Sequence, residues 1–100
     1  MKPVRFHPAA LEELVHEVEY YTAVSKQLGS SLADAIAAAI GRASEFPSMG
    51  PPYKYKTRRT FPGKYPFSLV YVEREADVFV LAFAPDSRKP GYWRSRVSAA

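Results

Sequence analysis

Apolar residues in the first half of the chain recur with the 3.6-residue period of an amphipathic α-helix. A short strand is predicted at residues 4–6, and Pro8 suits the first turn of the helix that follows it. The apolar stripe of this helix consists of Leu11, Leu14, Val15, Val18 and Tyr21. We expect the helix to end between residues 24 and 28, with Gly29 as its stop signal.

A second helix is predicted to begin at Ser31, because Asp34 stands three residues later in an arrangement that resembles a capping box. Alanines between residues 33 and 39 favour a helix and permit close approach to the first one. Its apolar stripe consists of Leu32, Ile36, Ala39, Ile40, Ala43 and Phe46. Prolines and a glycine over residues 47–52 end all helix, so the two helices are expected to form a hairpin.

In the second half of the chain the apolar period changes to 2, which is typical of β-strands. Residues 53–61 predict one strand and 67–73 a second. Residues 77–84 predict a third strand, which pairs antiparallel with the second through a short turn at 74–76. The resulting β-α-α-β-β-β order predicts a single α+β domain over residues 1–100. In this domain the helical hairpin packs on one face of a small, mainly antiparallel sheet, and a short C-terminal tail follows.

The third predicted strand is apolar on both of its faces, so both faces must be covered. One face is predicted to carry Phe79, Leu81 and Phe83. The other is predicted to carry Val78, Val80 and Ala82. The helical hairpin can cover only one of them. The second face is left either to the C-terminal tail, through Tyr92 and Trp93, or to another chain.

Composition excludes several classes of function. The chain has 100 residues, of which 47% are hydrophobic and none is cysteine. It is therefore expected to form one core without disulfides, cysteine zinc sites or thiol catalysis. No apolar run approaches the roughly 20 residues of a membrane span, and Met1-Lys2-Pro3 does not begin a secretory signal. We expect a soluble, cytoplasmic protein that does not bind membranes.

Charge is distributed unevenly between the two halves of the chain. Residues 1–50 contain four basic and six acidic residues, a net charge of −2. Residues 51–100 contain ten basic and four acidic residues, a net charge of +6. This asymmetry indicates an anionic partner for the second half, such as nucleic acid or an acidic protein segment. A basic face that serves only solubility is the alternative.

The segment from Tyr53 to Arg59 interleaves tyrosines with basic residues. On a single strand, Lys54, Lys56 and Arg58 would share one face at intervals of roughly 6.5–7 Å. Such a ladder can follow a phosphate backbone or a line of carboxylates, while the tyrosines stack on bases or pack in the core. The alternative is that the lysines protect an edge strand from edge-to-edge aggregation.

A second basic and aromatic cluster occupies residues 88–96, where Tyr92 is available as a proton donor. Alternatively, Tyr92 and Trp93 cap the core while the arginines are solvated. His7 and His16 have no metal-ligand spacing, and the four glutamates of the first helix fit a solvated face. No phosphate-binding glycine loop or nucleophile elbow is present, so we expect no metal and no cofactor. Any catalysis would use Lys, Arg and Tyr, as in phosphodiester cleavage by the 2′-hydroxyl of RNA.

Several short motifs together resemble the RelE/ParE superfamily, the toxins of type II toxin–antitoxin modules, also described as plasmid stabilisation proteins. The motifs are Phe6-His7-Pro8-Ala9-Ala10, Glu13-Leu14, Tyr20-Tyr21, Phe46-Pro47, Gly50-Pro51, Leu69-Val70-Tyr71 and Arg88-Lys89-Pro90-Gly91-Tyr92-Trp93. The last of these is the most specific, because it is similar to the ParE-like ending R-x-P-G-Y-W. The resemblance covers nearly the whole chain. It implies the fold of that superfamily, bacterial growth inhibition and a cognate antitoxin as partner.

The superfamily divides by target. RelE-like members are ribosome-dependent messenger RNA endonucleases, whereas ParE-like members inhibit DNA gyrase without cleaving nucleic acid. The resemblance implies that Lys54, Lys56 and Tyr92 would be the catalytic residues if this chain were a nuclease. However, Ser68 and Asp86 stand where the nucleases have arginines.

These departures favour the ParE-like alternative, because removing one preorganised cation from a phosphate site costs on the order of 10²–10³ in rate. Many ParE-like relatives have a histidine after the last strand, where this sequence has Pro85. In a ParE-like protein Arg58, Arg59, Arg88 and Trp93 are expected to bind the target. DNA would then be reached only indirectly, through the antitoxin. A RelE-like endonuclease and a non-catalytic nucleic-acid-binding module remain as alternatives.

Overall fold

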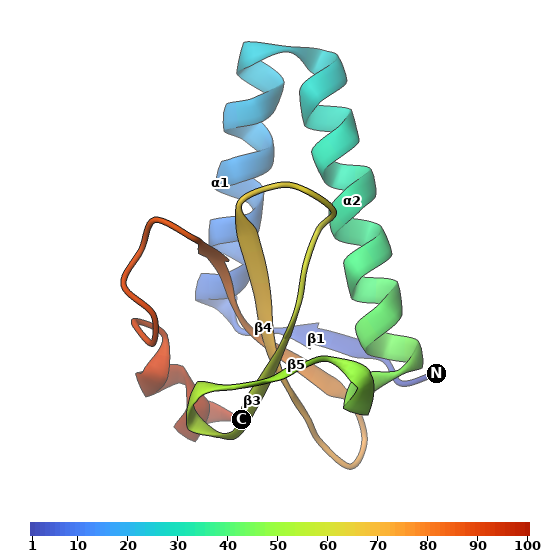
Figure 1. Cartoon of the computed structure of the whole chain (residues 1–100), viewed down its shortest axis with the longest axis vertical. Helices are drawn as coiled ribbons and strands as arrows, with labels where there is room; N and C mark the ends of the chain where they lie inside the picture. Colours follow the sequence, from blue (N-terminus) through green and yellow to red (C-terminus); the bar gives the residue numbers. More distant parts are fainter.

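The computed structural model describes all 100 residues, and its strands form one sheet beside a helical hairpin (Figure 1). The elements are β1 (Val4–Phe6), α1 (Pro8–Val24), α2 (Lys26–Glu45), β2 (Pro52–Tyr53), β3 (Thr57–Thr60), β4 (Phe67–Glu73) and β5 (Val78–Pro85), with the 3₁₀ segments η1 (Pro47–Met49), η2 (Lys54–Lys56) and η3 (Arg94–Ala99). The strand order is β1-β5-β4-β3-β2. Only the β1–β5 pair is parallel. The predicted α+β class and the mainly antiparallel sheet are confirmed.

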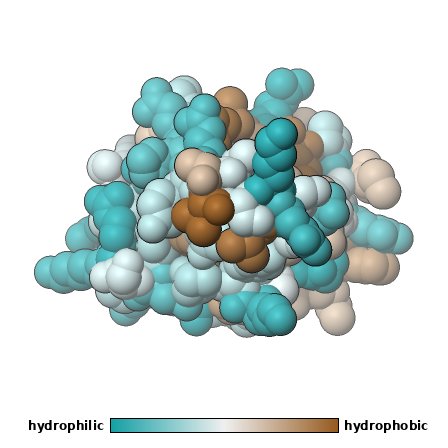
Figure 2. Space-filling view, turned by 90° about the horizontal axis from the view of Figure 1, so that it is seen from above, coloured by the Kyte–Doolittle hydropathy of each residue, from teal (hydrophilic) through white to brown (hydrophobic).

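The helical hairpin covers one face of the sheet and forms the larger of two cores. Its buried members are Ala10, Leu32, Ile36, Ala39, Ala43, Phe67, Leu69, Tyr71, Val78, Val80 and Phe83. The hairpin extends past the sheet, and a view onto its tip shows apolar side chains among hydrophilic ones (Figures 1 and 2). Val24 and Leu28 are the large apolar residues exposed near this tip. Neither helix combines the length and the apolar character needed to cross a bilayer.

The first helix ends at Val24, within the predicted range of residues 24–28, but the predicted stop at Gly29 and the predicted start of the second helix at Ser31 are wrong, because α2 begins at Lys26. The helical hairpin turns at Ser25, whose backbone is extended with φ −162°. The Ser25 N–H donates to the Tyr21 carbonyl at 2.9 Å, and its hydroxyl accepts from Leu28 N at 3.3 Å. Ser25 therefore ends α1 and caps α2. Gly29 lies inside α2, where an added Cβ would clash with Thr22 of α1. The glycine permits close helix packing and does not stop a helix.

A β-bulge in β5 reverses the faces predicted for the second half of that strand. The pairing with β4 passes from Ala82 directly to Val80, which leaves Leu81 as the extra residue. Phe83 therefore packs with the helices, and Ala82 lies on the opposite face, contrary to the predicted alternation. The Phe83 ring stacks on that of Phe67 with 4.7 Å between centroids.

The C-terminal tail covers the second face of the sheet. Trp93 is 1% exposed and packs with Val70, Leu81 and Ala82 in a separate small core. The sequence left open whether the C-terminal tail or another chain covers this face, and the structure shows that the tail does so.

Residues 53–61 do not form one strand, so this prediction is also wrong. β2 ends at Tyr53, and β3 begins at Thr57. Between them Tyr55 and Lys56 both have left-handed backbone, with φ of 61° and 62°. Two successive positive φ values reverse the chain, and β2 consequently pairs antiparallel with β3. The predicted ladder of three basic side chains on one strand does not exist.

Candidate functional site

A cleft of about 360 Å³ opens between the C-terminal tail and the edge of the sheet. We call it the tail cleft. Its principal lining residues are Tyr53, Arg59, Phe61, Ser68, Asp86, Arg88, Lys89, Tyr92 and Trp93. Three cationic residues and one acidic residue line it, so the cleft suits an anionic partner group.

Neighbouring arginines of β3 have different surroundings. The Arg59 guanidinium lies 4.0 Å from the ring centroid of Tyr53 and 5.1 Å from that of Phe61. These cation–π contacts hold it at the tail cleft. Arg58 does not line the cleft, and its Nη1 donates to the Gly50 carbonyl at 2.7 Å. The structure therefore separates two arginines that were both predicted to bind the target.

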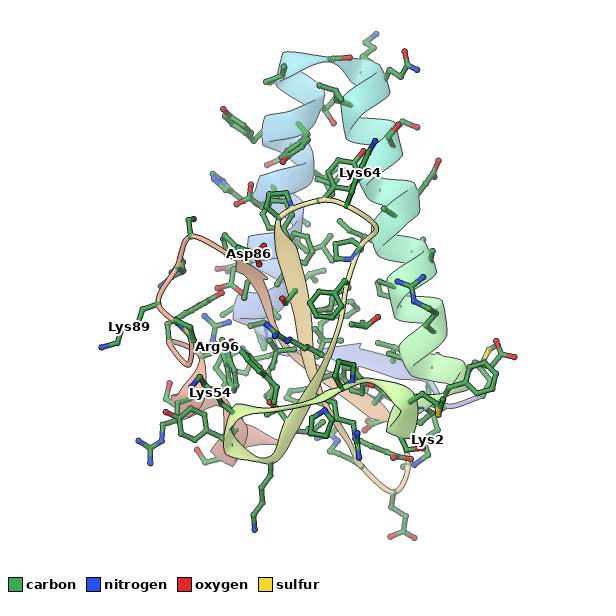
Figure 3. The ribbon with its side chains drawn as sticks, in the orientation of Figure 1. Lys2, Lys54, Lys64, Asp86, Lys89 and Arg96 are labelled. Carbon is green, nitrogen blue, oxygen red and sulfur yellow. The ribbon has the colours of Figure 1, made fainter.

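Arg88 lies over the mouth of the cleft. Its Cζ stands 3.6 Å from the centroid of the Tyr92 ring, and 54% of its side chain is exposed. Its Nη1 is 3.9 Å from Glu13 Oε2, a loose ion pair. Lys89 extends away from the molecule (Figure 3), and its side chain is exposed. Arg88 and Lys89 are therefore both accessible to a partner.

Glu13, which was expected on a solvated helix face, holds the tail instead. Its Oε1 accepts from the Phe83 N–H at 3.1 Å and from Arg96 Nη1 at 3.0 Å. Its Oε2 accepts from the Tyr92 hydroxyl at 2.9 Å and from Arg96 Nη2 at 3.0 Å. Arg96 Nη1 also donates to the Leu81 carbonyl at 3.0 Å. This two-pronged ion pair anchors the tail to α1 and β5.

The same contact restricts the chemistry of Tyr92. Burial, and next the hydrogen bond to Glu13, raise the pKa of the Tyr92 phenol well above its usual value of 10. The ring lines the tail cleft, but the hydroxyl proton is donated to the Glu13 carboxylate. In this arrangement the phenol is not free to donate a proton to a group bound in the cleft.

The two lysines predicted for catalysis are not among the residues that line this cleft. Lys54 and Lys56 are exposed in the η2 turn, and neither lines the tail cleft. Ser68 and Asp86 do line it. Tyr92 and Asp86 therefore line the same cleft. The negative charge of the Asp86 carboxylate would repel a phosphate group bound there.

Trp93 is buried, so its ring is not an accessible anchor for a target. It contacts the Tyr53 and Tyr55 rings, each at 5.9 Å between centroids. Arg94 adds a cation–π contact, with its Cζ 4.8 Å from the Tyr55 centroid. Trp93 thus ties the η2 turn to the tail, which is the packing role that the sequence left as an alternative.

No group of three His, Asp or Glu side chains is placed to hold a metal ion. The imidazole Nδ1 of His7 accepts from the Ala9 N–H at 3.1 Å, so His7 caps the start of α1. His16 is exposed on the same helix.

Comparison with protein-family models matches residues 4–90 to the ParE toxin of type II toxin–antitoxin systems, parDE. The matched segment contains both helices and all five strands. It also contains most of the tail cleft but ends before Tyr92 and Trp93. No curated protein matches the chain significantly.

Proposed function

The chain belongs to the ParE family of type II toxin–antitoxin toxins, and on this basis we propose that it inhibits bacterial growth by binding DNA gyrase. In this proposal the toxin contacts its target without cleaving nucleic acid. It acts in the cytoplasm, where a cognate antitoxin neutralises it. The toxin itself does not contact DNA, which is reached only through the antitoxin.

The observation that carries the choice of binding over cleavage is the hydrogen bond from Tyr92 to Glu13. A nuclease of this fold would need the phenol and lysines to converge on one phosphate. Here Lys54 and Lys56 lie in a separate turn, and Asp86 lines the cleft. Loss of one preorganised donor already costs on the order of 10²–10³ in rate. Metal-free phosphodiester cleavage is therefore disfavoured.

The target surface in this proposal is the mouth of the tail cleft. Arg59 and Arg88 contribute guanidinium groups that are fixed over aromatic rings, and Lys89 adds an exposed charge. Such groups accelerate and orient association with an acidic partner surface. Arg58 and Trp93 support this surface indirectly, through the β3 edge and the buried side of the tail.

A paired assay with purified components tests the proposal. The protein is added to a gyrase supercoiling reaction and, in parallel, to a ribosome-dependent messenger RNA cleavage reaction. We expect inhibited supercoiling and intact RNA. Cleaved RNA with unaffected gyrase would overturn the proposal, and Lys54→Ala, Lys56→Ala and Tyr92→Phe would then be expected to abolish cutting.

Growth experiments test the toxin–antitoxin assignment separately. Induction of the chain alone should slow bacterial growth, and co-expression of the neighbouring gene should restore it. Normal growth at high soluble expression would count against an active toxin. Binding to naked RNA or DNA that weakens steeply with salt, without any effect on gyrase, would favour the plain nucleic-acid-binding module.

A further inference from the structure

A second cavity, of about 520 Å³, lies between α2, η1 and β3. We call it the η1 cavity. Large apolar side chains stand exposed around it: Phe46 is 55% exposed, Met49 77% and Phe61 40%. Exposed apolar groups that gather around a hollow mark an interaction site more often than scattered ones do. Phe46 and Met49 do not line the tail cleft, whereas Phe61 lies between the two hollows and lines both.

The floor of the η1 cavity is rigid. It is formed by Tyr71, which is 1% exposed and donates its hydroxyl proton to the Pro47 carbonyl at 2.7 Å. Gly50 passes so close to this hydroxyl that an added Cβ would clash with it. The hydrogen bond fixes η1 relative to β4. The cavity therefore exists before any partner arrives, which reduces the entropic cost of binding.

The charged groups at the η1 cavity are all positive. Arg42 lines it and donates from Nη2 to the Phe61 carbonyl at 2.5 Å. Arg59 lines it as well, and its guanidinium lies 5.1 Å from the Phe61 ring. No acidic residue lines the cavity. Phenylalanine, methionine and arginine are also the residue types that are enriched in the centres of protein interfaces.

We propose that the η1 cavity binds an acidic peptide segment of a partner protein through one bulky apolar side chain. The apolar side chain enters the cavity, and flanking carboxylates pair with Arg42 and Arg59. The volume falls within the 300–1,000 Å³ that is typical of pockets that bind small ligands, so it accommodates an aromatic side chain. The η1 cavity adjoins the tail cleft and shares Arg59 and Phe61 with it, whereas Arg42, Phe46 and Met49 line the η1 cavity alone.

The test uses the full-length protein and a synthetic peptide with one tryptophan flanked on each side by three glutamates. One control peptide has alanine in place of tryptophan, and another has lysines in place of the glutamates. Binding is measured by anisotropy of a fluorophore on the peptide, and its location by backbone amide NMR shifts. We expect the first peptide to bind about tenfold more tightly than either control, with shifts at residues 46–50 and 59–61.

Matched variants of the protein then test whether the peptide binds at the η1 cavity. The double variant Phe46→Ala/Met49→Ala changes only exposed side chains and should weaken binding about tenfold. Val24→Ala/Leu28→Ala removes comparably exposed apolar groups at the hairpin tip and should leave the affinity unchanged. Arg42→Gln, which borders the η1 cavity but not the tail cleft, should weaken binding about threefold and reduce its salt dependence.

Several results would overturn the proposal. They are equal affinity for the tryptophan and alanine peptides, shifts confined to the tail cleft, or no binding at about 1 mM peptide. Equal binding of an uncharged tryptophan peptide would contradict the acidic component. Self-association that Phe46→Ala/Met49→Ala abolishes in sedimentation experiments would assign the cavity to a second copy of this chain. None of these readouts uses growth or gyrase, so they leave the proposed function independently testable.

Discussion

Glu13 carries four hydrogen bonds, and each of them reaches a residue at least 70 positions away in the chain. The Glu13 and Arg96 side chains are only 18% and 16% exposed. Removal of either charge leaves the other one poorly hydrated and unpaired, which is more costly than the loss of a surface ion pair. A single carboxylate on α1 thus holds the C-terminal tail in place.

Glu13→Gln should lower the free energy of unfolding by about 1–3 kcal/mol, because the Arg96 guanidinium loses its charged partner. Glu12→Gln is the matched control, since Glu12 is exposed on the same helix turn, and its effect should stay within about 0.5 kcal/mol. Urea unfolding followed by tryptophan fluorescence measures both. Equal stability of the two variants would refute the anchoring role of Glu13.

Asp77 forms the second strong ion pair of the molecule. Its two carboxylate oxygens accept from Arg74 Nε and Nη2, each at 2.6 Å, and Arg5 Nε lies 3.4 Å from Oδ2. The hydrogen bonds from Arg74 lower the pKa of the Asp77 carboxyl below its usual value. Because the native state favours the ionised form, this carboxylate stabilises the fold above the unfolded-state pKa of about 3.9.

The stabilisation by Asp77 should disappear as the pH falls through the lowered native pKa. We therefore expect Asp77→Asn to be less stable than the native chain above about pH 5, and the difference to shrink below about pH 4. Asp86→Asn, which removes an exposed carboxylate without an ion pair, serves as the control. Thermal unfolding of both proteins across this pH range measures the difference in stability. A difference that does not change with pH would contradict the proposed role of the ionised Asp77 carboxylate.

At the scale of the elements, the contact between the two helices depends on a glycine inside α2. Alanine is the better helix former by about 1 kcal/mol, so propensity alone favours replacement of both Gly29 and Gly41. Their surroundings differ. A Cβ at Gly29 would clash with Thr22, including its backbone, whereas a Cβ at Gly41 meets no atom within 4 Å.

Gly41→Ala should raise the free energy of unfolding by up to about 1 kcal/mol. Gly29→Ala should lower it by about 1–3 kcal/mol, because the helices must move apart. Chemical denaturation of the two variants gives this comparison directly. If both substitutions stabilised the protein, the contact between α1 and α2 at Gly29 would accommodate a methyl group without cost, contrary to this prediction.

At the scale of the whole molecule, the sheet is covered on one face by the helical hairpin and on the other by the tail. The tail consequently has a packing side and an exposed side, and the exposed side is the one that we propose binds the target. Trp93 belongs to the first, since it is buried in the smaller core. Arg88 belongs to the second, since more than half of its side chain is exposed.

This division predicts that stability and target binding respond to different substitutions. Trp93→Ala should cost about 3–5 kcal/mol of stability and reduce activity only through loss of folded protein. Arg88→Ala should change stability by less than about 0.5 kcal/mol yet weaken gyrase inhibition about tenfold. Thermal unfolding and the half-inhibitory concentration in the supercoiling assay measure the two effects. A stable Arg88→Ala protein with full inhibition would remove Arg88 from the target surface.

Much of the architecture was predictable because its signals are local. The 3.6-residue period, the breakers over residues 47–52 and the apolar runs at 4–6 and 67–73 each act within a few residues. The second strand of the predicted sheet was placed with the bounds of β4, Phe67–Glu73. Arg59, Arg88 and Tyr92, which the basic and aromatic clusters of the sequence singled out, all line the tail cleft, and their roles there stay predictions.

The errors occur where a distant contact outweighs a local preference. Gly29 continues a helix because Thr22 packs against it, and the bulge at Leu81 reverses a strand whose residues alternate regularly in sequence. Glu13 could not be distinguished from Glu12, because its partners follow 70 to 83 residues later. The sequence by itself thus determined the elements and their class, through periodicity and turn residues. Only the tertiary structure decided which charges pair and which aromatic rings are buried, because these depend on the packing of segments far apart in the chain.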